Sequence, residues 1–222
     1  MLIQHLPLLS SKRIVLASAS PRRSELLRGL GLKVEIVPST FAENLEKSAF
    51  AGAGEYAVAT ATQKAIEVFR RTCEAGKLAD LIVAADTVVE INTQILEKPL
   101  DKEDATRMLT SLSGCKHKVY SGVVLVLPSF SDPALDQSPL IRSFWEETVV
   151  EFAELEDEAI CAYAASGEPM GKAGGYGIQG IGGSFVKGIE GCFFNVMGFP
   201  VHRFCVEVDS LVKNGAFAAK PQ

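Results

Sequence analysis

Two neighbouring arginines near the start of the chain stand in a pattern that suits the binding of a phosphate group. Arg13–Ala17 predicts a strand, and Pro21–Leu30 predicts a helix whose first position is a proline that needs no N–H partner there. Ser20 stands at the expected N-cap, and Arg22 and Arg23 lie on the first turn. A helix N-terminus offers free N–H groups and a positive dipole end, so this segment could hold a phosphate chain. A helix start with solvated arginines is the alternative.

A second candidate for chemistry is the carboxylate of Asp86. It directly follows Leu81–Ala85, a continuous apolar run that is typical of a strand covered on both faces. Ligands of open α/β sheets bind beyond the carboxyl ends of strands. A carboxylate placed there can bind Mg²⁺ or take a proton from water. An aspartate that only caps or turns the chain is the alternative.

Three further charged residues carry weaker signals. Lys64 shares a helical face with the apolar residues Ala61 and Val68, because residues three and four apart are neighbours on a helix. Such a lysine either points into a cleft or packs its stem and reaches its ammonium to water, and the spacing favours neither. Glu43 is a lone carboxylate in a loop, and Lys98 is held extended by the proline that follows it.

The stretch from Gly171 to Gly183 is rich in glycine, which lets a backbone approach a ligand closely and adopt positive φ. It matches G-x-G-x-x-G at Gly175, Gly177 and Gly180, but it does not open an expected helix, so we reject a dinucleotide-binding fold. A flexible loop is the alternative to a binding loop. In a binding loop, Gln179 could read a base edge through both its donor and its acceptor.

Composition limits the class of protein. The 222 residues carry a formal net charge of −5 and are 47% hydrophobic, which is typical of a globular protein with a core and argues against broad nucleic-acid binding. No apolar run reaches membrane-spanning length. The order of apolar and charged residues at 1–13 is not that of a secretory signal, and we expect residues 1–11 to be a short lead-in to the first strand.

The cysteines and histidines give no metal site. Five scattered cysteines without a C-x-x-C pair indicate reduced thiols in a cytosolic protein, and most are expected in the core. The three histidines have no ligand spacing, so we expect structural roles for them.

Strand and helix patterns intermix along the whole chain, which predicts an α/β or mixed α+β fold with one main sheet. No linker is long enough to separate independent domains, so we expect one domain over residues 1–222, and its length suits either a single large unit or two small lobes around a cleft. A Pro- and Ser-rich linker is expected at Pro128–Pro139. The remaining expected strands are Val34–Val37, Thr87–Ile91, Gln94–Leu96, Val119–Leu127, Ile141–Phe152 and Phe185–Ile189, and the remaining expected helices are Glu55–Glu74, Lys102–Leu112, Asp157–Ala165 and Val201–Lys213.

Taken together, these segments resemble the Maf family of nucleoside triphosphate pyrophosphatases, including the Maf-like domain found beside a methyltransferase-like domain in some animal proteins. The matching segments occur in order over nearly the whole chain, and together they are highly specific. They are LASASPRR (16–23), TQKA (62–65), AADTVV (84–89), LEKP (96–99), LSGCKHKVYSGV (112–123), GEPMGKAGGYGIQGIGGSFV (167–186) and NVMGFP (195–200).

The resemblance implies the Maf/inosine triphosphatase-like fold, with an elongated mixed sheet and the substrate between two lobes. It implies hydrolysis of a nucleoside triphosphate to the monophosphate and pyrophosphate with a divalent metal, Mg²⁺ or Mn²⁺. It also implies a cytoplasmic homodimer that needs neither nucleic acid nor a membrane. The implied catalytic residues are Asp86, Glu43, Lys64 and Lys98, with Asp86 in the family's proton-acceptor position and Asp86 and Glu43 as implied metal ligands. Asp86 either activates the water directly or holds the Mg²⁺ that does, and the sequence leaves both roles open. The implied substrate-binding residues are Ser18, Arg22, Arg23, Thr87, Lys172 and Gln179.

Arg22, Thr87 and Gln179 match positions that mark the branch of the family acting on dTTP and UTP, so we expect these substrates, with CTP or modified pyrimidine nucleotides as possible additions. Two positions depart from the family pattern. Gly171 replaces a common aspartate, which puts a metal or hinge role there in doubt, and Ser121 replaces a common threonine but keeps the hydroxyl.

Two alternatives to this function stay open from the sequence. One is a nucleotide-sensing or division-regulating binding protein with little catalysis. The other is a house-cleaning hydrolase for 7-methyl-GTP.

Overall fold

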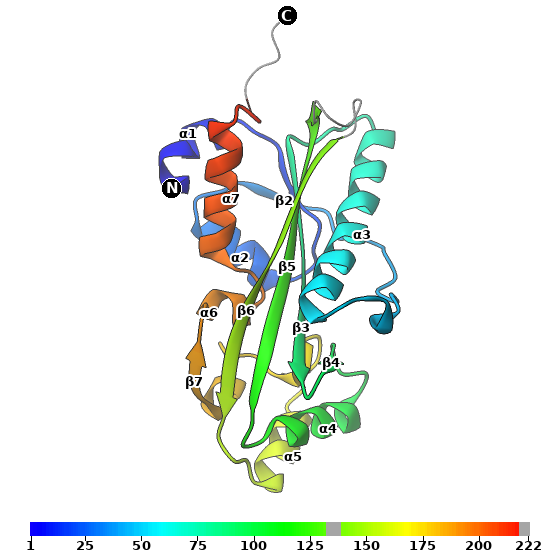
Figure 1. Ribbon diagram of the computed structural model, residues 1–222, viewed down its shortest axis with the longest axis vertical. Coiled ribbons are helices and arrows are strands. Elements are labelled where there is room, and N and C mark those ends of the chain that lie inside the picture. Colours follow the sequence, from blue (N-terminus) through cyan, green and yellow to red (C-terminus); the bar gives the residue numbers. More distant parts are fainter. Residues whose placement is uncertain (132–138, 218–222) are drawn as a thin grey trace, which may run out of the picture.

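The structure, a computed structural model, describes residues 1–131 and 139–217 (Figure 1). Within them, seven strands form one mixed sheet in the order β2-β1-β3-β5-β6-β7, and β4 pairs with β3. The strands are β1 Ile14–Leu16, β2 Val34–Ile36, β3 Leu81–Ile91, β4 Gln94–Leu96, β5 Lys116–Ser131, β6 Pro139–Phe152 and β7 Val186–Glu190. The α-helices of the described residues are α1 Leu6–Leu9, α2 Pro21–Gly29, α3 Ala53–Glu74, α4 Lys102–Leu112, α5 Asp157–Ala165, α6 Phe193–Met197 and α7 Val201–Lys213. The expected α/β class with one main sheet is confirmed.

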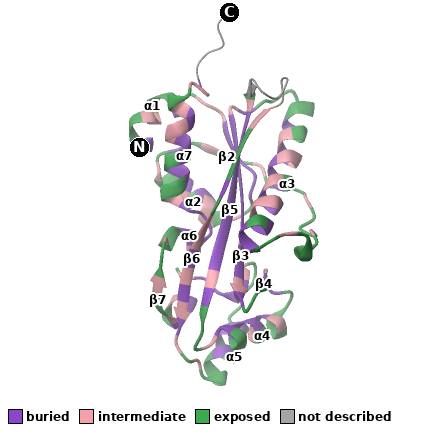
Figure 2. Ribbon diagram, in the orientation of Figure 1, coloured by how far each residue is buried: buried purple, intermediate pink, exposed green. Residues whose placement is uncertain are grey.

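The sheet is mixed because one short strand has parallel neighbours. β1 runs parallel to β2 and β3, whereas the other pairings of the described strands are antiparallel. β5 and β6 are long and run along the long axis of the molecule, so they connect its two halves (Figure 1). Figure 2 shows that the central strands are largely buried along this axis.

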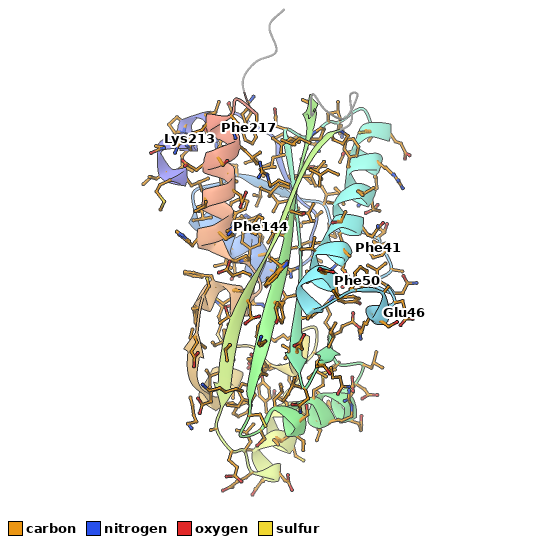
Figure 3. The ribbon with its side chains drawn as sticks, in the orientation of Figure 1. Phe41, Glu46, Phe50, Phe144, Lys213 and Phe217 are labelled. Atoms are coloured by element: carbon orange, nitrogen blue, oxygen red, sulfur yellow. The ribbon has the colours of Figure 1, made fainter. Side chains whose placement is uncertain are left out.

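In one half of the molecule, helices cover both faces of the sheet, with α3 on one side and α2 and α7 on the other (Figure 1). Successive residues of a strand point to opposite faces. In β3, Val83 accordingly packs with residues of α2 and α7, while Ala84 packs with residues of α3. In Figure 3, Phe144 and Phe217 lie on the side of α7, and Phe50 lies on the segment that leads into α3.

The other half has its own core, built between the far ends of the long strands and the helices α4 and α5. Asp101 caps α4 as expected, because its side chain accepts a hydrogen bond from the N–H of Asp104 at 2.8 Å. Further residues of this core come from the glycine-rich segment, including Tyr176. This core therefore holds the glycine-rich segment against the end of the sheet.

Several expectations about single elements were wrong. Residues 1–11, expected only as a short lead-in to the first strand, form a 3₁₀ turn at Leu2–His5 and the helix α1, because Leu2 and Leu9 are buried in the core beside α7. The expected linker Pro128–Pro139 partly belongs to β5 and β6, where a shift in register after Leu127 accommodates the proline. Residues 132–138 of that linker lie outside the described residues.

The cysteines also differ from expectation. All five thiols are free, but Cys73, Cys115 and Cys161 are exposed, and only Cys205 among them is buried. The expectation that most of the cysteines lie in the core is therefore met only by Cys205. Of the exposed ones, Cys73 lies on α3 and Cys161 on α5, and Cys115 lies in the turn between α4 and β5.

Candidate active site

A gap in the pairing of β3 opens the sheet at the site. One edge of β3 pairs with β5 along most of its length. The other edge pairs with β1 as far as Val83 and with β4 from Val89 onward. In the described part of the chain, the stretch between them, which holds Asp86 and Thr87, faces no strand on that edge. Successive strand residues point to opposite faces, so the gap gives one cavity access to both side chains.

This position corrects the expectation that Asp86 ends a strand. Leu81–Ala85 and Thr87–Ile91 are one continuous strand, and Asp86 pairs with Gly122 of β5 in its middle. The strand that ends here is its parallel neighbour β1, whose last paired residue is Leu16. Asp86 therefore still lies beyond the carboxyl end of a parallel strand, which is where ligands bind in such sheets.

Asp86 and three other predicted residues form a chain of alternating charge. Lys64, which is buried on the inner face of α3, donates to Oδ1 of Asp86 at 2.8 Å. Its Nζ also lies 2.9 Å from Oε2 of Glu43. The ammonium of Lys98 donates to the other oxygen of Glu43 at 3.1 Å. Of the two interpretations of Lys64, the one that points it into a cleft is confirmed, because it joins both carboxylates at the cavity.

The two carboxylates have different proton affinities. Burial raises the pKa of Asp86 above its ordinary value, although Lys64 and Arg23 oppose this effect. Burial acts in the same direction on Glu43, but there Lys64 and Lys98 outweigh it and lower the pKa to about 2. Carboxylates whose environments move their pKa values apart can take different roles, with the one of higher pKa better suited to accept a proton.

Arg23 is fixed by three acceptors from three parts of the chain. It donates to the Ser18 hydroxyl at 3.1 Å, to the Thr87 hydroxyl at 3.0 Å and to the carbonyl of Gly198 at 2.9 Å. Burial lowers the pKa of its guanidinium, and the nearby Asp86 opposes this. Arg23 therefore stands beside Asp86 as a buried cation with a fixed orientation.

The start of α2 differs in one detail from the expected cap. Ser20 has the extended backbone of an N-cap, but its side chain makes no capping hydrogen bond in the described structure. Its N–H instead donates to the Ser18 hydroxyl at 3.2 Å. The Ser18 oxygen thus accepts from both Ser20 and Arg23, which leaves its own O–H free to donate to a ligand.

The remaining predicted substrate-binding residues line the same cavity, where Arg22 lies near Lys172 of the glycine-rich segment. Nε of Arg22 is buried without a hydrogen-bond partner among the described residues. Burial lowers the pKa of Lys172, and the charge of Arg22 lowers it further. Gln179 is exposed at the edge of the cavity. This part of the cavity therefore offers two cations and an amide that the protein itself leaves largely unused.

One cavity of about 780 Å³ contains all of these groups. Its lining includes every one of the ten predicted site residues, namely Ser18, Arg22, Arg23, Glu43, Lys64, Asp86, Thr87, Lys98, Lys172 and Gln179. A volume of this size suits a small-molecule ligand. The whole lining carries five cationic side chains against three carboxylates, those of Glu43, Asp86 and Glu168, so the cavity is positive although the whole chain carries −5.

The carboxylates fit a divalent cation that is shared with a ligand. Asp86 and Glu43 converge on one point, because both contact the same ammonium of Lys64. No group of three or more His, Cys, Asp or Glu side chains that could hold a metal occurs in the part of the chain that the structure describes. Mg²⁺ is commonly held by one or two carboxylates together with substrate phosphates. The residues present therefore fit such a shared site rather than a closed protein cage.

Sequence reasoning missed residues that hold this site together. The Ser121 hydroxyl lies 2.8 Å from that of Thr87 and donates to the carbonyl of Asn195 at 3.1 Å. The amide of Asn195 is fully buried and donates to the Val119 carbonyl at 3.0 Å. These contacts join residues far apart in sequence. The motifs that contain Ser121 and Asn195 marked the two residues, but no local pattern showed that they meet.

Gly171 stands at the edge of the cavity, at the position where the family resemblance implies an aspartate. Its φ is +72°, and a Cβ at this position would meet no atom within 4 Å. The space at the cavity edge is therefore open. The nearest carboxylate of the lining in sequence is that of Glu168.

Comparison with known proteins places the chain in a family. The family model described as "Maf-like protein" matches residues 13–211. The human "Probable bifunctional dTTP/UTP pyrophosphatase/methyltransferase protein" is 50% identical over 201 residues, which cover 90% of this chain but 32% of that protein. The chain thus spans about a third of the length of this relative.

Bacterial relatives match over nearly their whole length. The dTTP/UTP pyrophosphatase of Clostridium perfringens is 45% identical over 192 residues, which cover 86% of this chain and 93% of the relative. That of Ruminiclostridium cellulolyticum is 44% identical over 193 residues, with 86% and 92% covered. The chain belongs to the Maf-like protein family.

Proposed function

We propose that this protein hydrolyses dTTP and UTP to the nucleoside monophosphate and pyrophosphate. The observation that carries the proposal is one cavity in which the buried carboxylate of Asp86 faces a cluster of fixed cations. The similarity to proteins named dTTP/UTP pyrophosphatase supports the choice of substrate. CTP and modified pyrimidine nucleotides are further substrates that we include in the proposal.

In the proposed reaction, water attacks the α-phosphorus and the bond to the β-phosphate oxygen breaks. Asp86 takes a proton from the attacking water, which its raised pKa favours. Negative charge grows on the departing pyrophosphate, and Arg23, Lys64 and Lys98 are placed to neutralise it. Because Arg23 and Lys64 are already oriented by hydrogen bonds, little reorganisation is needed when the charge develops.

A divalent cation, Mg²⁺ or Mn²⁺, would be held by Asp86 and Glu43 and would supply charge neutralisation to the phosphate oxygens. Lys64 contacts both carboxylates, so it keeps them facing the cavity. The Ser18 hydroxyl offers a proton to a phosphate oxygen beside Arg23. These residues bind and orient the triphosphate independently of the base.

The base is assigned to the part of the cavity beside the glycine-rich segment. Gln179 can pair with a base edge, and Arg22 and Lys172 can donate to carbonyl oxygens, which are abundant on uracil and thymine. Thr87 is hydrogen-bonded to Arg23 and Ser121, so we propose that it influences the substrate through the orientation of Arg23.

Replacing Gln179 by alanine should change the preference among bases more than the turnover of the best substrate.

The proposal is tested by product analysis of the wild-type protein with dTTP, UTP, CTP and 7-methyl-GTP, each in Mg²⁺ and in Mn²⁺. We expect dTTP and UTP to give pyrophosphate and the monophosphate. Release of orthophosphate would contradict cleavage at the α-phosphorus. Tight binding of dTTP without pyrophosphate release would favour the nucleotide-sensing alternative. A clear preference for 7-methyl-GTP would favour the house-cleaning hydrolase.

We further propose that the protein works in the cytoplasm as a homodimer. Five free thiols suit a reducing compartment, and the dimer rests on the family resemblance alone. None of the helices in the described residues is long and apolar enough to cross a bilayer. Light scattering coupled to size exclusion would test the dimer, and a monomer mass would contradict it.

A further inference from the structure

The glycine-rich segment after Gly171 is wrapped around one carboxylate, that of Glu168. One carboxylate oxygen of Glu168 accepts the N–H of Gly182 at 3.2 Å and the hydroxyl of Tyr163 at 2.9 Å. The other accepts the N–H of Ile181 at 3.1 Å. Three donors from two parts of the chain therefore converge on this side chain.

Tyr163 and Lys172 connect this cluster to the beginning of the loop and to the segment before it. The Tyr163 oxygen also accepts the N–H of Gly177 at 3.2 Å. The ammonium of Lys172 donates to the backbone carbonyl of Glu168. The loop between Gly177 and Gly182, with Gln179 near its middle, is thus tied at both ends to the same cluster.

The close approach favours glycine at three positions, because any larger residue would displace the side chains that hold the loop. A Cβ at Gly180 would lie 2.3 Å from the Glu168 carboxylate, and one at Gly182 would lie 2.5 Å from the Tyr163 hydroxyl. A Cβ at Gly177 would lie 2.7 Å from the side chain of Lys172. The glycine pattern of this segment therefore fits a carboxylate of the protein itself, rather than the phosphates of a dinucleotide.

We propose that Glu168 is a positioning residue for base selection, because it holds the Gly177–Gly182 loop so that Gln179 stays at the cavity edge. The inference rests on the proposed nucleotide function. Glu168 itself lines the cavity, but its carboxylate accepts three hydrogen bonds from the loop and from α5. We therefore assign its effect to the placement of Gln179 and not to the phosphates. The cations of the phosphate end come from α2, α3 and the segment after β4, and they make no hydrogen bond to this loop among the described residues.

The first test measures base preference in steady-state kinetics. In Glu168→Gln, one acceptor oxygen becomes an N–H₂ donor that faces a backbone N–H, so the loop loses its anchor. We expect the ratio of kcat/KM for UTP over CTP to fall about 10-fold, mostly through KM, with kcat for UTP within about 2-fold of wild type. Glu158→Gln, an exposed glutamate on α5, is the charge-matched control and should leave the ratio unchanged.

A double-variant cycle shows whether Glu168 changes the base preference through Gln179 or independently of it. If Glu168 acts through Gln179, Glu168→Gln should not change the UTP/CTP ratio further when Gln179→Ala is already present. Additive losses would overturn the proposal. Tyr163→Phe keeps the carboxylate but removes one of its donors, so it provides a milder variant that should shift the ratio in the same direction.

A measurement without nucleotide distinguishes failure of this inference from failure of the proposed function. Hydrogen exchange at the N–H groups of Ile181 and Gly182 should quicken at least about 10-fold in Glu168→Gln, while exchange in β3 stays the same. Unchanged exchange at these two groups would overturn the proposal even if the enzyme is active. Faster exchange in a protein that hydrolyses no nucleotide would contradict the proposed function but would still support Glu168 as the residue that holds the loop.

Discussion

At the scale of single residues, Lys64 connects the two carboxylates of the site. Its ammonium lies within 3 Å of oxygens of both Asp86 and Glu43, and its side chain is almost fully buried. Removing one partner from a buried charge cluster leaves the other charges uncompensated, which is costly. Lys64 is therefore needed both for charge on the leaving group and for the arrangement of the carboxylates.

Replacing Lys64 by methionine, which has a similar length and no charge, should lower turnover of dTTP at least ~100-fold. The reason is that both carboxylates lose their shared cation and the triphosphate loses a charge partner. Steady-state assays of pyrophosphate release measure the effect. Lys33→Met, at an exposed lysine, is the control, and turnover of Lys64→Met close to that of Lys33→Met would refute this role.

The burial of His117 makes the free energy of unfolding depend on pH. It is buried beside Tyr176, whose hydroxyl lies 2.8 Å from Nε2, and burial lowers its pKa to about 4. Between pH 6.5 and pH 4 the unfolded state binds a proton that the folded state does not, so stability is lost as pH falls through this range. A shift of this size corresponds to about 3 kcal/mol.

Urea unfolding of the wild type and of His117→Gln at pH 7 and pH 4 measures this contribution. Because carboxylates titrate in both proteins, the difference between their two pH dependences is the relevant quantity. We expect the wild type to lose more stability on acidification than the variant. Equal losses would mean that His117 does not contribute.

Individual residues could be predicted from sequence where local spacing or a motif carried the signal. The apolar helical face around Lys64 and the paired arginines of α2 are examples. The partners that fix them could not, because Arg23 is oriented by Gly198 and Thr87, which are distant in sequence. The anchoring role of Glu168 was hidden for the same reason, since its donors come from the loop that follows it and from α5.

At the scale of elements, the placement of α3 against β5 depends on Gly122. A Cβ there would lie 2.4 Å from the backbone nitrogen of Val58 and 2.5 Å from the carbonyl carbon of Ala57. These are backbone atoms of α3, so they cannot move aside without moving the helix. The same helix carries Lys64, and Gly122 pairs with Asp86 across the sheet.

Gly122→Ala should therefore destabilise the protein by about 1–3 kcal/mol and lower activity as α3 moves away from β3. Chemical denaturation and the pyrophosphate assay measure the two effects. Gly188→Ala is a matched control in β7, because a Cβ there would meet nothing within 4 Å. If both variants were equally stable, the close contact would not matter for the fold.

Element types and the last helix could be predicted well from periodicity and caps, as α7 and the cap of α4 illustrate. The continuity of β3 could not, because the charged Asp86 interrupts an otherwise apolar run. Its place in a strand is decided by the long partner β5, which pairs with it over nine residues. The helix at Leu6–Leu9 likewise forms because its residues are buried against α7. No local sequence pattern indicates that burial.

At the scale of the whole molecule, the cavity is assembled from segments that span most of the chain. Its cations come from α2, α3, the segment after β4 and the glycine-rich loop, and its lining extends to Gly198. An anion that binds there therefore links many elements at once. Binding to the folded state alone must stabilise the whole fold.

Pyrophosphate should accordingly raise the melting temperature in the presence of Mg²⁺. At a concentration 100 times its Kd, the free energy of unfolding should rise by about 2.7 kcal/mol, which corresponds to roughly 5–10 °C for a chain of this size. Lys98→Met should weaken the effect by removing one cation. The absence of any shift in the wild type up to millimolar pyrophosphate would contradict a phosphate-binding cavity.

The most direct measurement is the turnover of Asp86→Asn on dTTP, with pyrophosphate binding measured in parallel. Asparagine keeps the shape of the side chain but cannot accept a proton from water, while Lys64 keeps Glu43 as its partner. We predict a loss of at least ~100-fold in kcat with pyrophosphate binding retained. Turnover near that of the wild type would contradict the account, because the buried carboxylate would then have no part in the reaction.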